Sequence, residues 1–304
     1  MDDDFFRGEG SRATRRREQR ARARRNRIIT LSVLLLAVAA VAGVVLLLSR
    51  AGDSGGGGGE AQAVAAAPSG APAATPTASS SASPTPTPTP SPTPPPLDEP
   101  TKKDPMRVYF GGDSLAGLPG VLFAQHGSES GLMKVHTDYQ VSSRLTNPDP
   151  VDWPDHLQSE LTSGHPDVGV FMIGINDPGM PMIAKGSFTM YPKKAWLEEY
   201  QRRAEKLMKI MLHEGVKRVY WVGLPIMPEK GQTNQVKRLN QLFKTAAGHH
   251  RDVVYVDTFD LLADKKGRFV ASLRSGDGVH FTDEGAGRIA EAVWAAIKAD
   301  WRQQ

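Results

Sequence analysis

The sequence contains no cysteine among its 304 residues, so the protein has no disulfide bonds and no thiolate ligands for a metal ion. This absence leaves the redox compartment undetermined, and the compartment has to be inferred from topology. Residues 105–304 also contain no G-x-S-x-G motif, which argues against an ordinary α/β-hydrolase. None of its histidines is interpreted as a metal ligand, and we expect neither a metal ion nor another cofactor.

Net charge is nearly absent from the larger part of the chain. Residues 105–304 hold 24 basic and 23 acidic side chains, so the chain's net charge of +4 comes mainly from its arginine-rich N-terminal tail. A nucleic-acid-binding domain usually carries a basic patch or stripe. We therefore expect no nucleic-acid partner.

Charged residues are missing altogether from residues 28–49, a run of 22 residues rich in leucine, valine and alanine. As a helix this run would be roughly 33 Å long, which matches the hydrocarbon core of a bilayer. Ten arginines lie in residues 1–27 and only Arg50 follows closely, so the positive-inside rule predicts a cytoplasmic N-terminus and an extracytoplasmic remainder. The alternative is a cleaved signal peptide, but the run exceeds the usual core of about 7–15 residues. We expect a single-pass membrane anchor.

Residues 50–104 contain little besides glycine, alanine, serine, threonine and proline, including five consecutive glycines and a Thr-Pro repeat. Such a composition has too few large apolar side chains to form a core. We expect a disordered linker that holds the following domain away from the membrane.

Residues 105–304 are long enough to form one domain with its own core. Apolar runs predict four buried strands and one weaker candidate at residues 134–141; the four are 107–110, 168–173, 219–222 and 253–256. Between the strands lie helical patterns, the clearest at residues 194–214, 233–247 and 282–301. This alternation predicts an α/β fold in which helices cover both faces of a parallel sheet. In such sheets ligands bind beyond the carboxyl ends of the strands.

Two of these strand ends carry polar residues of interest. Residues 111–115 read Gly-Gly-Asp-Ser-Leu and place Ser114 between the first strand and an expected helix, where a nucleophile would be accessible. The alternative is that Ser114 only caps that helix. After the third strand, Asn176 could donate its side-chain amide to a developing oxyanion, or could belong to a simple turn.

Near the C-terminus, Asp277 and His280 stand three residues apart in one loop. His280 could act as a general base and Asp277 as the carboxylate that orients it. The alternative is that Thr282 caps the last helix and that His280 is an incidental loop residue. The combination of a serine, a donor amide and an Asp-His pair at these places favours the catalytic interpretation.

Together these residues resemble the SGNH hydrolase superfamily, also called the GDSL esterases and lipases, over residues 106–302. The resemblance implies a flavodoxin-like three-layer α/β/α sandwich with a five-stranded parallel sheet. It also implies that Ser114 is the nucleophile, that Asp277 and His280 complete a triad, and that the Ser114 backbone N–H and the Asn176 side chain donate to the oxyanion. Residues 142–154 resemble a bacterial cell-envelope branch of the superfamily.

One position departs from the family pattern. The family usually supplies a further oxyanion N–H from a glycine after the second strand, and Arg144 occupies that place. Every residue except proline keeps its N–H, so Arg144 can donate if it tolerates the backbone angles of the glycine. If it does not, activity could be weak or absent. The guanidinium could contact an anionic group of the substrate or point to solvent.

These observations predict an extracytoplasmic, membrane-anchored serine esterase that acts on small acyl esters, with O-acetyl esters of cell-envelope glycans as the expected substrates. Two alternatives stay open. With a sugar hydroxyl in place of water as the acceptor, the same residues would form an O-acetyltransferase. Without a working oxyanion hole, the domain would be a catalytically silent glycan-binding or scaffold module. The sequence indicates no oligomeric state.

Overall fold

The computed structural model describes residues 95–301. In this part of the chain five parallel strands form one sheet in the order β2-β1-β3-β6-β7. They are β1 (Met106–Gly112), β2 (Met133–Tyr139), β3 (Val168–Met172), β6 (Arg218–Val222) and β7 (Val253–Val256). All five predicted strands are present, including the weaker candidate, and their parallel pairing confirms the predicted fold class.

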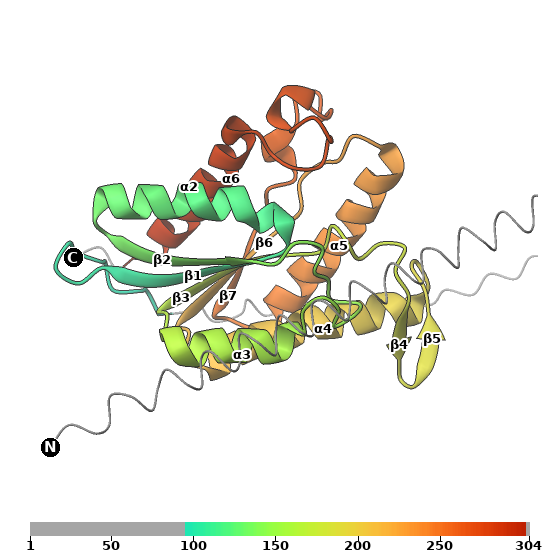
Figure 1. Ribbon diagram of the computed structural model, residues 1–304, viewed down its shortest axis with the longest axis horizontal. Coiled ribbons are helices and arrows are strands. Elements are labelled where there is room, and N and C mark those ends of the chain that lie inside the picture. Colours follow the sequence, from blue (N-terminus) through green and yellow to red (C-terminus); the bar gives the residue numbers. More distant parts are fainter. Residues whose placement is uncertain (1–94, 302–304) are drawn as a thin grey trace, which may run out of the picture. The chain divides into compact units, whose positions relative to one another are not determined.

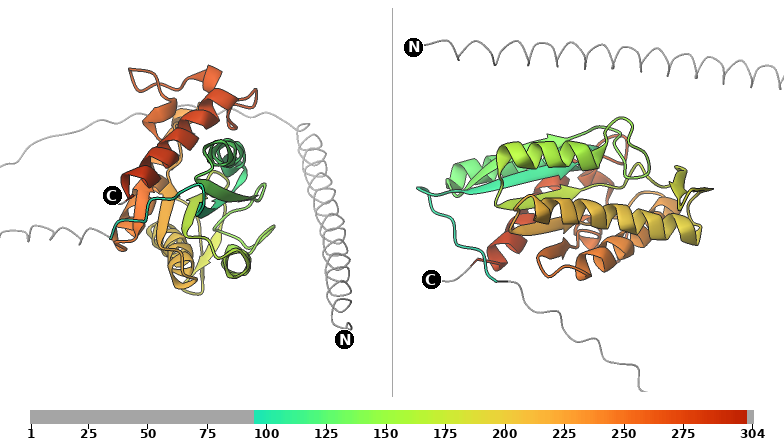
Figure 2. Two further views of the ribbon diagram at one scale, coloured as in Figure 1. Left: turned by 90° about the vertical axis from the view of Figure 1, so that its left-hand side faces the viewer. Right: turned by 90° about the horizontal axis from the view of Figure 1, so that it is seen from below.

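Helices cover both faces of this sheet (Figures 1 and 2). One face carries α2 (Ser114–Ser130) and α6 (Asp283–Ala299), and the other carries α3 (Trp153–Gly164), α4 (Lys194–His213) and α5 (Lys230–Gly248). The strands β3 and β6 are buried at every position, because helices lie on both sides of them. The result is the expected three-layer sandwich.

Three short elements lie in the connections. A two-stranded antiparallel hairpin, which the sequence patterns did not predict, consists of β4 (Met182–Ala184) and β5 (Ser187–Thr189) and precedes α4. Two 3-10 turns, η1 (Asp260–Leu262) and η2 (Ala271–Leu273), lie between β7 and α6. The hairpin and these turns therefore belong to the segments that follow the carboxyl ends of β3 and β7.

The first described residues pack against the amino-terminal edge of the sheet. Arg218, the first residue of β6, is almost fully buried and donates a hydrogen bond of 2.6 Å to the carbonyl of Pro95. Leu97, in a segment that the sequence placed in the linker, is buried and forms a bridge with Trp301. The chain thus joins the domain at the edge opposite to the one where the strands end.

The expected membrane anchor at residues 28–49 lies outside the described residues, as does most of the expected linker. Of the helices between residues 95 and 301, none combines the length and the apolar character that crossing a bilayer requires.

Candidate active site

The structure brings Ser114, His280 and Asp277 together at the carboxyl edge of the sheet. Nε2 of His280 lies 2.9 Å from Oγ of Ser114, and Nδ1 of His280 lies 2.6 Å from Oδ2 of Asp277. Ser114 is the first residue of α2, whereas the other two residues belong to the loop before α6. The fold, and not a local turn, therefore creates this hydrogen-bonded chain of hydroxyl, imidazole and carboxylate.

The turn that carries Ser114 depends on a close approach of backbone. Gly112 has a φ of +146°, and a Cβ at this position would lie 1.8 Å from the carbonyl oxygen of Met172. Only glycine fits there. The next residue, Asp113, caps α2 by accepting the N–H of Leu115, so Ser114 is not the cap and its hydroxyl is left to contact His280.

Asp113 also joins the turn after β1 to the turn after β3. Its fully buried carboxylate accepts the N–H groups of Gly174 at 2.8 Å and Ile175 at 3.3 Å. Burial raises the pKa of Asp113 to about 6, although the three backbone N–H donors oppose this shift. The carboxylate thereby fixes Ser114 relative to the segment that contains Asn176.

The loop before α6 is organised around the Asp277 carboxylate. Its Oδ1 accepts the backbone N–H groups of Val279 and His280 and the hydroxyl of Ser275, while Oδ2 contacts the imidazole. The hydrogen bond from His280 is the main cause that holds the pKa of Asp277 far below its usual range. An ionised carboxylate in this place fixes the orientation and tautomer of the imidazole. Thr282 caps α6, as the alternative interpretation expected, but His280 is not an incidental loop residue because its imidazole contacts both Ser114 and Asp277.

A buried arginine also holds the loop before α6 in place. Arg274 donates hydrogen bonds to the carbonyl oxygens of Val279 at 2.7 Å and Ile226 at 2.6 Å, and its guanidinium lies 4.6 Å from the ring centroid of Phe281. Burial lowers the pKa of Arg274 to about 10. The side chain therefore joins the loop of His280 to the segment that follows β6.

Two of the three predicted oxyanion donors, Asn176 and Arg144, lie on adjoining segments. Nδ2 of Asn176 donates to the carbonyl of Ser143 at 3.0 Å, which leaves its second N–H for another acceptor. Non-glycine residues with positive φ in the described chain are Ser142, His165 and Lys185. Arg144 is not one of them, so it does not need the backbone freedom of a glycine. Its guanidinium donates to the carbonyl of Ser142.

The backbone N–H groups of Ser114 and Arg144 have no acceptor among residues 95–301. The N–H of Ser114 also lies at the start of α2, where the helix dipole favours negative charge. Together with the side-chain amide of Asn176, these N–H groups belong to the segments that follow β1, β2 and β3, and donors of this kind can stabilise a tetrahedral oxyanion.

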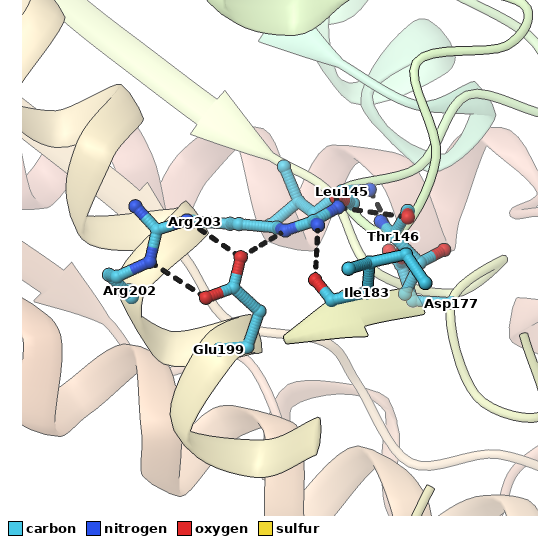
Figure 3. Close-up of polar contacts among 7 residues, drawn as sticks. All are labelled: Leu145, Thr146, Asp177, Ile183, Glu199, Arg202 and Arg203. Atoms are coloured by element: carbon cyan, nitrogen blue, oxygen red, sulfur yellow. Dashed lines mark hydrogen bonds and ion pairs between the residues drawn. The ribbon is translucent and has the colours of Figure 1, made fainter. Parts of the chain in front are cut away.

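A buried carboxylate and an arginine hold the segment that contains Arg144 (Figure 3). Asp177 accepts the N–H groups of Leu145 and Thr146, both at 2.8 Å, while Arg203 of α4 donates to the carbonyl oxygens of the same two residues. Arg203 also donates to Glu199 and to the carbonyl of Ile183 in the hairpin. We call this set of contacts the Arg203 clamp. It fixes the backbone directly after Arg144 from both sides.

Burial raises the pKa of Asp177 to about 7, against the opposing effect of the N–H of Thr146 and the hydroxyl of Tyr200. The negative charge of Asp113 contributes to the same rise. These two buried carboxylates are therefore close enough to interact, and they belong to the turns that carry Ser114 and Asn176.

Comparison with known proteins gives a family. Residues 107–296 match a family described as "Protein of unknown function (DUF459)". The chain belongs to the DUF459 family. No curated protein matches it.

Solved structures resemble this DUF459 protein at low identity. An alpha/beta hydrolase enzyme from the metagenome of Lake Arreo has 17% identity and a TM-score of 0.50, over 64% of this chain and 95% of that one. An acetylxylan esterase from Geobacillus stearothermophilus has 16% identity and a TM-score of 0.48, over 66% and 97%. A GDSL-like lipase from Bacteroides thetaiotaomicron has 15% identity and a TM-score of 0.46, over 67% of this chain and 92% of that one. The likeness to the Lake Arreo enzyme shows a shared fold.

Sequence reasoning missed several residues that shape the site of this DUF459 protein. Asp113 and Asp177 stand beside Ser114 and Asn176 in the sequence, and their position next to the candidate residues was the available signal. Arg203 in α4 and Arg274 after η2 had no such signal, because no motif distinguishes either arginine from a surface cation. Residues 95–301 contain no group of three histidine or carboxylate side chains that could hold a metal ion.

Proposed function

We propose that this protein is a serine ester hydrolase in which Ser114 is the nucleophile. The observation that carries the proposal is the continuous hydrogen-bonded chain from Oγ of Ser114 through His280 to Asp277. The proposed oxyanion donors are the N–H groups of Ser114 and Arg144, which have no acceptor in residues 95–301, and the side-chain amide of Asn176. An activated hydroxyl and an oxyanion hole are the two requirements of acyl transfer.

The geometry supports the following sequence of steps. Oγ of Ser114 attacks the ester carbonyl carbon while Nε2 of His280 takes the hydroxyl proton, and Asp277 stabilises the imidazolium that forms. The N–H groups of Ser114, Arg144 and Asn176 receive the oxyanion. The tetrahedral intermediate expels the alcohol, which takes the proton from His280, and leaves an acyl ester on Ser114. Water, deprotonated by His280, then attacks this ester; the bond to Oγ of Ser114 breaks, Oγ takes the proton back from His280, and the carboxylic acid leaves.

Exposure of the triad favours hydrolysis over transfer to a second sugar. The side chains of His280 and Asp277 are 46% and 50% exposed, so water reaches the acyl-enzyme directly. A transferase needs a site from which water is excluded. The catalytically silent alternative depended on strain at Arg144, and the backbone of Arg144 provides no such strain.

We further propose that the domain works outside the cytoplasm, tethered by residues 28–49, and that it removes small acyl groups, O-acetyl groups above all, from cell-envelope glycans. The topology proposal rests on the distribution of arginines around the apolar run. The glycan proposal follows from that location and from the open, shallow setting of the triad.

The test uses the purified full-length chain with 4-nitrophenyl acetate and with O-acetylated polysaccharides, from which released acetate is measured. Ser114→Ala and His280→Ala should each lower kcat by about 10⁴- to 10⁶-fold, whereas Asn176→Ala should lower it by about 10²- to 10³-fold. Ser128→Ala, at the far end of the same helix, is the control and should keep the wild-type rate. A Ser114→Ala variant that hydrolyses esters at the wild-type rate would exclude the serine mechanism.

A further inference from the structure

A cleft of about 250 Å³ has Arg144 in its lining and contains none of the triad residues in its walls. The segment after β2, the start of α3 and the middle of α4 form its walls. Four basic side chains line it: Arg144, Arg202, Arg203 and Lys206. The acidic residue in its lining is Asp152. We call it the basic cleft.

The positive charge of the basic cleft is only partly neutralised. Arg202 and Arg203 share Glu199, with contacts of 2.6 and 2.8 Å, and Arg203 is occupied by the clamp described above. In residues 95–301, Arg144 and Lys206 have no carboxylate within ion-pair distance. Four cations against Glu199 and Asp152 leave an excess of two positive charges.

This excess is local, because the domain as a whole is nearly neutral. Residues 105–304 hold 24 basic and 23 acidic side chains, so a uniform distribution would leave almost no net charge at any one place. A concave site with charge of one sign attracts and retains ligands of the opposite sign. An anionic ligand would account for the local excess of positive charge in the basic cleft.

Arg144 connects the basic cleft to the reaction. Its side chain lines the cleft, and its backbone N–H follows Ser143, whose carbonyl is in contact with Asn176. A substrate whose ester carbonyl lies at Ser114 would extend past Arg144 into the cleft if it continues in that direction. The guanidinium of Arg144 uses Nε and Nη2 on the carbonyl of Ser142, and its remaining N–H groups stay available.

The geometry points to the basic cleft as a subsite for an anionic group, a carboxylate or a phosphate, on the same glycan chain that carries the ester. This inference rests on the proposed esterase function and specifies its substrate class: an acylated acidic polysaccharide. Arg144 supplies a planar guanidinium that can bind either a carboxylate or a phosphate, and Lys206 supplies a second positive charge in the same cleft. The neighbouring sugar would then position the ester at Ser114.

The experiment compares O-acetylated dextran in three forms: unmodified, carboxymethylated and phosphorylated. Acetate release by the full-length protein is measured at about 20 mM and about 500 mM salt. We expect at least one of the two anionic forms to have a kcat/KM about tenfold above that of the neutral form at low salt, and we expect this preference to shrink at high salt because exposed charges are screened. The form with the larger preference identifies the source of the charge.

The variants Lys206→Gln and Lys206→Glu separate the cleft from general electrostatics. The ratio of kcat/KM on anionic to neutral dextran should fall about threefold in the first and further in the second. Lys244→Gln is the matched control, because Lys244 is an exposed lysine on α5 outside the cleft, and it should keep the wild-type ratio. Equal kcat/KM values on all three dextrans, or an equal fall in the Lys244→Gln variant, would overturn the inference.

Failure of the esterase proposal is recognised separately. If no dextran releases acetate, binding of the non-acetylated carboxymethyl and phosphoryl dextrans to the Ser114→Ala protein is measured by calorimetry. Binding that weakens in the added Lys206→Glu variant would retain the anionic subsite without the chemistry. An absence of binding to both polymers would overturn the subsite as well.

Discussion

Asp113 and Asp177 are the residues on which the shape of the site depends most, although neither contacts the Ser114 hydroxyl. Each is fully buried and accepts backbone N–H groups from turns that carry candidate catalytic residues. A buried acceptor of this kind is costly to leave unpaired, so the turns and the carboxylates hold one another in place. The raised pKa values, to about 6 and about 7, reflect the burial that this arrangement requires.

Arg144 provides a direct test of the oxyanion hole at the residue scale. Its backbone already avoids positive φ, so Arg144→Gly relieves no strain and should change kcat on the neutral substrate 4-nitrophenyl acetate less than threefold. Arg144→Pro removes the N–H and should lower kcat by about 10²- to 10³-fold. Initial rates over a range of 4-nitrophenyl acetate concentrations provide kcat for each variant.

Arg144→Ala keeps the N–H and serves as the control for loss of the side chain. If the Arg144→Pro protein has the wild-type thermal midpoint and the wild-type kcat, this backbone position is no part of the oxyanion hole. A large gain of kcat in Arg144→Gly would instead mean that the arginine strains the loop in solution.

At the scale of elements, the Arg203 clamp joins α4 to two loops at once. A lysine in this place keeps the charge but cannot reach three carbonyl oxygens and Glu199 together. Arg203→Lys should therefore lower kcat about tenfold and leave the KM for 4-nitrophenyl acetate within twofold, because the oxyanion donors lose their alignment while the approach to Ser114 stays open.

The control for Arg203 is Arg288→Lys. Arg288 also connects a helix to a loop carbonyl, that of Leu261, and to a carboxylate, that of Glu284, but it does not contact the segment of Arg144. It should keep the wild-type kcat. If both variants lose stability equally and neither loses kcat, the clamp has only a structural role.

The start of α3 is attached to the sheet by a contact that depends on pH. Nε2 of His156 lies 2.7 Å from Oδ2 of Asp138 in β2, which raises the pKa of His156 above its ordinary value. The resulting stabilisation is fully present below the unfolded-state pKa of about 6.5 and is lost as the pH rises through the raised pKa. His156→Gln should therefore lower the free energy of unfolding by about 1 kcal/mol at pH 5.5 and hardly at all at pH 9.

Urea denaturation of both proteins at the two pH values measures this difference. His136→Gln is the control, since His136 contacts Glu160 at 3.1 Å with 62% of its side chain exposed, and such a pair contributes little. An equal deficit for His156→Gln at both pH values would mean that the loss comes from packing against Trp153 and not from the charge of the imidazole.

The elements also separate what a sequence can predict from what it cannot. Periodic apolar runs predicted all five strands, and α4 and α5 were predicted within a few residues of their observed bounds, because burial imposes a regular pattern on an element. The hairpin of β4 and β5 was missed because its two strands have only three residues each and expose Ile183 and Phe188, so their buried positions are too few to form a recognisable pattern. Ser114, Asn176, Asp277 and His280 could be singled out as candidates because they belong to short motifs just after a strand or just before a helix. Arg203 was not, because its role arises only when α4 meets the loops.

On the scale of the whole molecule, the chain enters the domain at one edge of the sheet, and the candidate active site lies at the opposite edge. Pro95 and Leu97 contact Arg218 and Trp301 at the amino-terminal edge of the sheet, and Ser114 follows the carboxyl end of β1. Pro95 and Ser114 therefore lie at opposite ends of the strands of the sheet.

The proposed topology has a simple test. Protease added to intact cells whose wall has been removed should digest the domain of residues 105–304 and leave the N-terminal tail intact, because the arginines before residue 28 hold the tail in the cytoplasm. Antibodies to each end of the chain distinguish the two fragments. Digestion of the tail with protection of the domain would mean the reverse orientation.

The central claim is that the hydroxyl of Ser114, activated by His280, is the nucleophile. A fluorophosphonate ester tests it directly, because it modifies a serine only when that serine is activated. In the full-length protein one equivalent should attach to Ser114, as located by peptide mass spectrometry, and ester hydrolysis should disappear in step with the labelling. Labelling of a different residue with loss of activity, or a fully labelled Ser114 with undiminished hydrolysis, would contradict the account.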